Sequence, residues 1–407
     1  MWFDKQPWKA LYLIYEALTI LLIRIPIWTI LNIPRFMRPR RSWNLSRAVF
    51  VKTMRYLSVV EENTGPLGNL SPSDHRAILS GKGVLALWIP PAPESLVVGK
   101  LKQWAEHADV APIRIPGYWI HKAGTDIQMG ARAQPGEKVI LALHGGAYIR
   151  LSAHPSDLST AIALGLLKHV DGVNRVFAPE FRLSSAEPFE AANPFPAALL
   201  DALTGYLYLV KSLGFSPSDV ILEGNSSGGN IACALTRYLT EYRGIFELPA
   251  PPGALLLLSP WADLSDSHNE IPGGSATTFV EFDILGRTTE TLKYPVRAFT
   301  GPHGLEEAQI NPYISPASLH PNLVVDFKKF PRTFIVAGGV EVLVDQIRTL
   351  RDRMVKDMSE GNGVSEGDGK VRYLEPPDAI HDYLSFSWHE PEVTDTLKAI
   401  AEWIALS

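Results

Sequence analysis

The stretch VILEGNSSGGN, residues 220–230, decides the fold of this chain. Its first residues, 220–223, predict a short buried strand, and an apolar segment typical of a helix follows the glycines. Between them, GNSSG at 224–228 fits the pattern G-x-S-x-G, in which a serine lies on a sharp turn from a strand to a helix. Glycines are needed there because the turn is tight. The register of the pattern makes Ser226, rather than Ser227, the candidate nucleophile.

Strands and helices alternate through the chain from about residue 112. Further strands are predicted at 113–120, 126–133, 138–143, 175–178, 254–259, 333–337 and 371–374, and a helix with apolar residues at three- and four-residue spacing is predicted at 196–213. This alternation predicts an α/β fold with a mostly parallel, eight-stranded sheet and helices on both faces. Ligands of such sheets bind beyond the carboxyl ends of the strands, where Ser226 is expected.

The stretch HGGAY follows the predicted strand at 138–143. Acyl transfer needs backbone N–H groups aimed at the developing oxyanion, and small residues let the backbone approach the substrate carbonyl. In esterases and lipases, the loop after this strand supplies such donors. We predict that the N–H groups of Gly146, Ala147 and Ser227 form the oxyanion hole, with Gly145 adjoining.

A serine hydroxyl becomes a nucleophile when a histidine takes its proton and a carboxylate orients that histidine. In α/β-hydrolases the chain order is serine, acid, histidine. His381 follows the last predicted strand and is the candidate base. Glu341 and, one helical turn later, Asp345 are both candidates for the acid. His144 and His154 lie near the donor loop, and we expect them to shape it.

The chain resembles the hormone-sensitive lipase family of α/β-hydrolases, also called the alpha/beta-hydrolase-3 group. Beside the motifs above, the resemblance is carried by EFRL at 180–183, EPF at 187–189, 194–201, SPWADL at 259–264, NPYISP at 311–316, 339–345 and 378–383. It covers about residues 112–405 and implies the α/β-hydrolase fold with a helical lid. It also places the acid at Glu341, where relatives usually have Asp.

Three positions depart from the family pattern. The usual GDSAGG reads GNSSGG here, with Asn225 in place of Asp and Ser227 in place of Ala, and the third glycine of the oxyanion loop is Ala147. The backbone donors survive these changes, because only the N–H group is needed. Ser227 adds a hydroxyl beside the nucleophile.

The resemblance implies a carboxylesterase or deacetylase that cleaves an ester of an apolar small molecule through Ser226, His381 and Glu341. Transacylation, lactone formation or cyclisation in the same pocket is the alternative, because motifs do not distinguish water from another acceptor. A ligand receptor is also considered, since the plant gibberellin receptor resembles this family but lacks the catalytic histidine. No cofactor or metal motif is found.

The N-terminus is basic and apolar. Residues 1–50 hold eight basic and two acidic side chains, although the whole chain has a net charge of −5. The apolar stretch 11–33 is long enough to cross a bilayer, and Pro26 is expected to kink or end its helix. Lys9, Glu16 and Arg24 would share one narrow arc of that helix.

Three interpretations of the segment 8–41 stay open: a helix lying in the membrane surface, a tilted single span, or a helix docked on the protein's own lid. Arginines 35, 38, 40 and 41 follow the apolar stretch, which favours lipid head groups and places the catalytic body on the cytosolic side. No small-residue cleavage site follows it, so a removed signal peptide is not expected. The acidic body argues against nucleic acid.

The predicted organisation has three parts. Residues 1–41 associate with membrane, 42–110 form a helical lid segment, and 111–407 form the catalytic domain. A lid insertion is expected at about 264–325, in which 283–300 is predicted to be a helix. The single cysteine, Cys233, excludes an intramolecular disulfide and fits a reducing compartment. A homodimer is possible.

Overall fold

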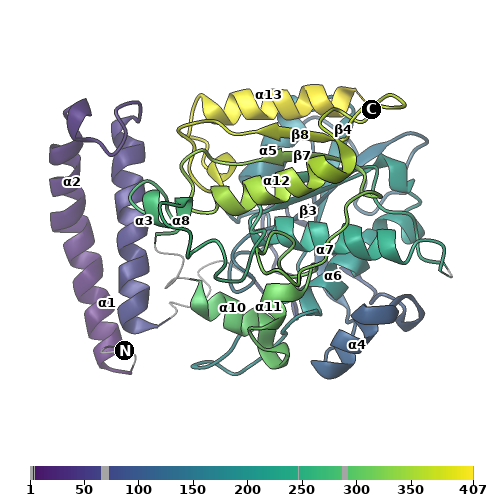
Figure 1. The fold of residues 1–407 in the computed structure, drawn as a ribbon, viewed down its shortest axis with the longest axis horizontal. Helices are drawn as coiled ribbons and strands as arrows, with labels where there is room; N and C mark the ends of the chain where they lie inside the picture. Colours follow the sequence, from purple (N-terminus) through teal and green to yellow (C-terminus); the bar gives the residue numbers. More distant parts are fainter. Residues whose placement is uncertain (1–2, 4, 66–72, 246, 287–291, 407) are drawn as a thin grey trace.

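A computed structural model describes residues 1–407 apart from 1–2, 4, 66–72, 246, 287–291 and 407. A central sheet lies between helical layers, and a helical pair stands at one side of the body (Figure 1). The strands are β1 (Leu85–Ile89), β2 (Ile115–His121), β3 (Lys138–Leu143), β4 (Val173–Pro179), β5 (Val220–Asn225), β6 (Ala254–Leu258), β7 (Arg332–Val336) and β8 (Val371–Leu374).

The eight strands form one sheet in the order β1-β2-β4-β3-β5-β6-β7-β8. β2 runs antiparallel to both β1 and β4, and the remaining neighbours are parallel. The predicted α/β class and the mostly parallel eight-stranded sheet are therefore confirmed. The crossover places β5, which carries Ser226 at its end, between β3 and β6 in the centre of the sheet.

One predicted strand is wrong and one strand was not predicted. Residues 126–133 form no strand, because Gly130 takes a φ of 72° that interrupts an extended path, and the carbonyl of Ala131 accepts a hydrogen bond from Arg175 instead of from a strand. β1 (Leu85–Ile89) takes the eighth place and pairs with β2 at the edge of the sheet. The segment 42–110, expected to be a helical lid segment, therefore also contains one strand of the central sheet.

Helices cover both faces of the sheet. The α-helices of the described residues are α1 (Trp8–Thr19), α2 (Ile25–Asn32), α3 (Leu45–Thr64), α4 (Gly99–His107), α5 (Thr160–His169), α6 (Ala197–Leu207), α7 (Ser227–Glu241), α8 (Ser275–Thr278), α10 (Lys293–Thr300), α11 (Glu307–Ile310), α12 (Val344–Met358) and α13 (Glu392–Ala405). α6, α7 and α12 cover one face, while α5, α13 and the start of α3 cover the other. Because side chains alternate along a strand, Leu222 and Ile221 of β5 enter these two different cores.

The helix predicted at 283–300 is shorter than expected. α10 begins at Lys293, residues 287–291 lie outside the described part, and residues 283–285 form bends. The buried carboxylate of Asp283 accepts the N–H groups of Ile284 and of Val342, which fixes this segment in a non-helical path. The helix predicted at 196–213 is present as α6, continued by a π-helical turn.

The N-terminal helix does not end at Pro26. α1 continues through a π-helical turn, Ile20–Arg24, directly into α2, and Pro26 lies in the first turn of α2. Proline lacks an N–H group, and the wider turn before it accommodates the missing bond. The run Trp8–Asn32 is long and apolar enough to cross a membrane, by length and composition. It packs on α3, which lies between it and the catalytic body (Figure 1).

Candidate active site

Ser226 lies on a strained turn between β5 and α7. Its φ of 52° and ψ of −119° are unusual for a residue with a side chain, and such strain is typical of a nucleophile at a strand-to-helix turn. A Cβ on Gly228 would lie 1.9 Å from the carbonyl oxygen of Leu143, and one on Gly224 would lie 2.3 Å from the carbonyl oxygen of Gly228. Both positions therefore admit only glycine, which explains the motif physically.

Three of the predicted residues meet at the carboxyl edge of the sheet. His381 Nε2 lies 3.0 Å from Ser226 Oγ, and His381 Nδ1 lies 2.6 Å from a carboxylate oxygen of Glu341. The second oxygen of Glu341 accepts the N–H of Gly338 at 2.8 Å. All three side chains are buried, with His381 only 3% exposed and Glu341 not exposed. The arrangement is a hydrogen-bonded chain from carboxylate to imidazole to hydroxyl.

Asp345, the other candidate acid, points elsewhere. Its carboxylate forms a salt bridge with Arg348 at 3.0 Å and accepts the N–H of Ser275 at 2.7 Å. Of the two candidates, only Glu341 contacts the imidazole of His381. Glutamate fits at this position although it is one methylene longer than the usual aspartate. It lies in the turn after β7, where the N–H of Gly338 holds its carboxylate in place.

The predicted donor loop lies beside the nucleophile. A Cβ on Gly145 would lie 3.1 Å from the Cβ of Ser226. Gly146 has a φ of 102°, and Ala147 and Tyr148 also have positive φ values, so the loop turns sharply back over the serine. A Cβ on Gly146 would lie 2.0 Å from a backbone carbonyl oxygen, which excludes any larger residue there. The loop therefore brings Gly145 next to Ser226.

Comparisons with known proteins show the family and the fold of the chain. The Abhydrolase_3 sequence profile, described as an alpha/beta hydrolase fold, matches residues 140–384, which is more than half of the chain. A solved esterase from the bacterial hormone-sensitive lipase family has a similar fold, with a TM-score of 0.54 and 20% identity, over 93% of this chain and 95% of that one. The chain belongs to the Abhydrolase_3 family of alpha/beta hydrolases.

Curated relatives of this hydrolase carry esterase names. It is 28% identical to an acetyl-hydrolase of Streptomyces hygroscopicus over 263 residues, which are 65% of this chain and 73% of the relative. It is 25% identical to an esterase of Acinetobacter venetianus over 297 residues, which are 72% of this chain and 81% of the relative. Each match therefore extends over most of the chain rather than over a short shared motif.

Buried carboxylates surround the imidazole of this hydrolase. Burial by itself lowers the pKa of His381, but the charges of Asp382, Glu341 and Asp283 outweigh it and raise that pKa above its ordinary value of 6.5. Burial raises the pKa of Glu341 above its ordinary value, and the contact with His381 opposes this rise. The imidazole is thus prepared to accept a proton and to be held as an imidazolium.

Asp283 is a site residue that the sequence did not reveal. Its carboxylate accepts the backbone N–H of His381 at 3.0 Å and that of Val342, the residue after Glu341, at 2.8 Å. One buried side chain from the expected lid insertion therefore ties together the loops of the base and the acid. No local motif marks this role, because the three residues meet only in the tertiary structure.

Two of the three departures from the family pattern, Asn225 and Ser227, form side-chain hydrogen bonds. The amide of Asn225 donates to Asp382 at 2.9 Å, whereas an aspartate at 225 would place two carboxylates against each other. The hydroxyl of Ser227 accepts the N–H of Tyr148 at 3.3 Å and so links the nucleophile turn to the donor loop. Both departures therefore add a hydrogen bond next to the reacting serine.

Two histidines and a glutamate support the donor loop. His144 stacks on Phe181, with ring centroids 4.0 Å apart, and contacts the carbonyl of Gly145. Burial lowers its pKa to about 4, so the ring is neutral and unsuited to act as a charged partner. Glu180 accepts bonds from Ser152 and from the backbone at residue 153. The Nδ1 atom of His154 lies 2.8 Å from the hydroxyl oxygen of Ser156.

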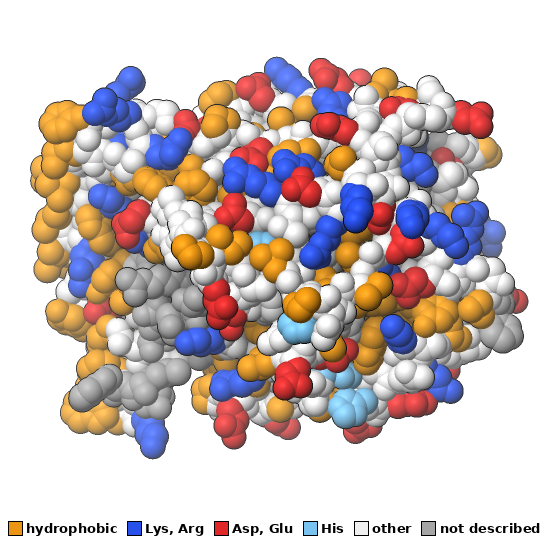
Figure 2. Space-filling model, viewed as in Figure 1, with side chains coloured by type: hydrophobic (Ala, Val, Ile, Leu, Met, Phe, Trp, Pro, Cys, Tyr) orange, Lys and Arg blue, Asp and Glu red, His pale blue; other side chains and the backbone are white. Residues whose placement is uncertain are grey.

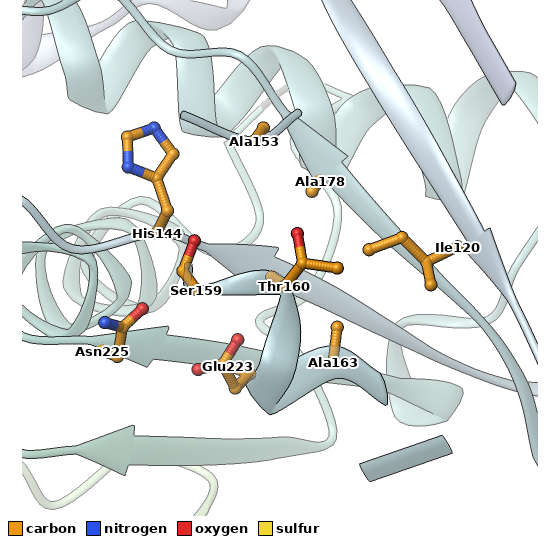
Figure 3. Close-up of a pocket in the computed structure, with 10 residues that line it drawn as sticks. Ile120, His144, Ala153, Ser159, Thr160, Ala163, Ala178, Glu223 and Asn225 are labelled. Atoms are coloured by element: carbon orange, nitrogen blue, oxygen red, sulfur yellow. The ribbon is translucent and has the colours of Figure 1, made fainter. Parts of the chain in front are cut away.

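A small cavity lies beneath this loop, between the sheet and α5 (Figure 3). His144, Asn225 and Glu223 contribute polar groups to its wall, and Ala153 and Ala163 contribute apolar ones. Burial raises the pKa of Glu223 well above its ordinary value, which favours a neutral carboxyl group. The residues that line the cavity include none of Ser226, Glu341 and His381, so it is not a candidate for the substrate pocket.

Proposed function

We propose that this carboxylic ester hydrolase, a serine-type carboxylesterase, cleaves its substrate through an acyl-enzyme formed on Ser226. The observation that carries the proposal is the hydrogen-bonded chain from Glu341 through His381 to Ser226, at 2.6 and 3.0 Å. The strained backbone of the serine and its position at the carboxyl end of β5 support the same assignment.

In the first half of the reaction, His381 Nε2 takes the proton of Ser226 as Oγ attacks the ester carbonyl carbon. The N–H groups of Gly146, Ala147 and Ser227 stabilise the negative charge that develops on the carbonyl oxygen. When the tetrahedral intermediate collapses, the imidazolium gives its proton to the leaving alcohol. Glu341 holds the ring in the required tautomer and stabilises the imidazolium throughout.

In the second half, His381 takes a proton from water, and the resulting hydroxide attacks the acyl group on Ser226. The intermediate collapses, Ser226 recovers its proton from the imidazolium, and the carboxylic acid leaves. Each half-reaction uses the same donors, so one arrangement of the loop serves both steps. Hydrolysis is favoured over transfer to another acceptor because both curated relatives above have names that denote hydrolases.

The proposed substrate is an apolar alcohol esterified with a short acyl group such as acetyl. One relative is named acetyl-hydrolase. Behind the donor loop, the ring of Tyr148 stacks on Phe299 with centroids 3.7 Å apart, and Trp261 lies beside them, all three being buried. We infer that these rings limit the length of the acyl chain that fits on this side of Ser226.

The test uses the full chain, a fluorophosphonate and p-nitrophenyl esters of increasing acyl length. We expect labelling of wild type, no labelling of Ser226→Ala, and the highest kcat/KM with the acetyl or propionyl ester. Labelling that persists in Ser226→Ala would overturn the nucleophile assignment. A preference for acyl chains of eight or more carbons would overturn the short-acyl assignment only. Adding an alcohol and measuring transesterified product separates hydrolysis from acyl transfer.

A further inference from the structure

The helical run α1–α2 presents an apolar surface outward. Its exposed large side chains include Trp8, Leu11, Leu18, Leu22 and Ile30, which we call the outer face. Leu22 is 70% exposed and Ile30 is 65% exposed. Apolar side chains line the edge of the molecule where α1 and α2 lie (Figure 2). At 1.5 Å per residue, the run Trp8–Asn32 is about 37 Å long, which is far more than an isolated surface patch.

The polar residues of the same run point inward. Glu16 is 5% exposed and accepts the hydroxyl of Tyr56 from α3 at 2.9 Å, while Arg24 stacks on the Tyr56 ring at 3.9 Å. Asn32 is fully buried, and its amide donates to the carbonyl of Trp28. Glu16 and Arg24 of the predicted polar stripe therefore face α3, while the exposed side of the run is largely apolar.

α3 is fastened to the catalytic body along its length. Arg47 forms a two-pronged salt bridge with Glu392, at 2.9 Å for both contacts. Arg55 pairs with Glu281, and Phe50 packs against Phe386 with ring centroids 5.1 Å apart. If α1–α2 crossed a bilayer, α3 and this charged flank of the body would lie beside it in hydrocarbon. Charged groups in hydrocarbon are costly, so the arrangement disfavours a span.

We propose that α1–α2 lies in the plane of a lipid bilayer surface, with the outer face in the acyl–headgroup boundary and α3 holding the body above it. Basic side chains are placed to meet anionic head groups at both ends, with Lys5 exposed before α1 and Arg35 and Arg41 exposed after α2. In this arrangement the apolar side chains of α1–α2 face lipid, the flanking cations face phosphate groups, and Glu16 and Arg24 face α3.

A second copy of the chain fits the outer face less well. Whether two helices paired in parallel or antiparallel fashion, the basic end of one would meet a basic end of the other, because Lys5 and Arg41 mark opposite ends of the run. Like charges in contact oppose association. Anionic lipid head groups complement both ends at once, and an apolar acyl layer covers the surface between them.

α3 and the connection between α2 and α3 also border the loops of the candidate active site. Arg40, between α2 and α3, pairs with Asp378, three residues before His381. The carboxylate of Glu61 on α3 pairs with Arg150, which follows the donor loop, at 3.3 Å. The membrane surface would thus lie next to the site. We infer that the substrate is an ester dissolved in lipid, an inference that rests on the proposed esterase function.

The orientation is tested with introduced cysteines, since the native Cys233 is buried. Full-length Lys5→Cys and Arg41→Cys are expressed, and sealed membrane vesicles are treated with a membrane-impermeant maleimide, with and without detergent. For a helix in the surface plane, both positions react alike under each condition. Reaction of one position in intact vesicles and of the other only after detergent would show a span and overturn the proposal. So would recovery of wild type in the soluble fraction.

The outer face is tested by the double variant Leu22→Asp/Ile30→Asp in flotation with vesicles of phosphatidylcholine and phosphatidylserine. The matched control is Leu305→Asp/Val324→Asp, two equally exposed apolar residues of the body, 58% and 81% exposed. We expect at least about a tenfold loss of partition for the first and little change for the second, because acidic groups oppose both burial and anionic lipid. Equal loss in both, or none in the first, overturns the proposal.

Substrate delivery is tested separately from catalysis. With an acetyl ester of a long-chain alcohol in vesicles, Leu22→Asp/Ile30→Asp should lose about tenfold in turnover, while its rate on water-soluble p-nitrophenyl acetate stays at the wild-type value. Equal loss on both esters would overturn lipid delivery. Ser226→Ala should bind vesicles like wild type yet turn over neither ester, so failure of the esterase proposal and failure of the membrane proposal give different results.

Discussion

The α1–α2 run and the central strand β5 are both rich in apolar side chains, but they place them oppositely. In β5, Ile221 and Leu222 are buried in two cores on either face of the sheet. In α1–α2, Leu22 and Ile30 are exposed, while Glu16 is buried. Hydropathy along a segment therefore does not tell whether its apolar side chains form a core or a surface. The neighbours decide, because β5 has a strand on each side, whereas α1–α2 packs chiefly on α3 among the described elements.

The largest expected effect is a loss of kcat from a change at the end of β5, with no change in α1–α2. Ser226→Ala removes the nucleophile, and we expect kcat on p-nitrophenyl acetate to fall by about 10⁴-fold or more. Ser227→Ala is the matched control: it keeps the N–H donor, loses the hydroxyl contact with Tyr148, and should cost only a few-fold in kcat. If the two variants lose activity equally, the register of the motif is wrong.

Glu341→Gln should give the next largest loss, about 10³-fold in kcat, because the amide cannot stabilise an imidazolium and favours the wrong tautomer of His381. Asp345→Asn is the control, since its carboxylate contacts Arg348 rather than the histidine. Steady-state kinetics and the melting temperature of both variants provide the measurement. A greater loss in Asp345→Asn would move the acid to that position.

Asp283→Asn tests whether a lid residue positions both catalytic loops. Asparagine keeps one acceptor oxygen, but its NH₂ group would face either the N–H of His381 or that of Val342. We expect kcat to fall by about 10- to 100-fold with little change in KM, because the reacting groups are misaligned while binding is kept. A proportional rise in KM, or a loss explained by unfolding in the melting curve, would contradict a positioning role.

A pH profile tests the charges around the base. The reaction needs neutral His381, and nearby carboxylates raise its pKa, so kcat/KM should fall as pH drops through that raised value. Asp382→Asn removes the strongest of these charges and should move the acidic limb of the profile to lower pH. An unchanged limb would show that Asp382 is already protonated in the working range and does not act on the histidine.

The smallest expected effect completes the comparison. Leu22→Asp/Ile30→Asp changes the outer face but no contact of the triad, so kcat/KM on soluble p-nitrophenyl acetate should stay within about twofold of wild type. A large loss of kcat/KM on this soluble ester would mean that α1–α3 control the active site directly, for instance through the contact of Arg40 with Asp378. The two regions would then be coupled rather than independent.

Local patterns carried the predictions that succeeded. The α/β class and seven of the strands follow from short apolar runs separated by turns, and these are local properties. The turn at Ser226 also follows from local chemistry, because only glycine fits at positions 224 and 228. The predictions that failed depend on neighbours: residues 126–133 alternate like a strand but have no strand to pair with, and β1 is half-buried at an edge, where its pattern is weak.

By itself, the sequence predicted the family, the G-x-S-x-G motif, the glycine-containing loop at 144–148 and the presence of an apolar N-terminal helix, because each depends on residues that are close in the chain. Only the tertiary structure decided which acid faces His381, that Asp283 joins the two catalytic loops, and that the polar side of the N-terminal helix faces α3. These are contacts between residues 40 to 98 positions apart in the chain. Chain topology and packing create such contacts, and no local pattern records them.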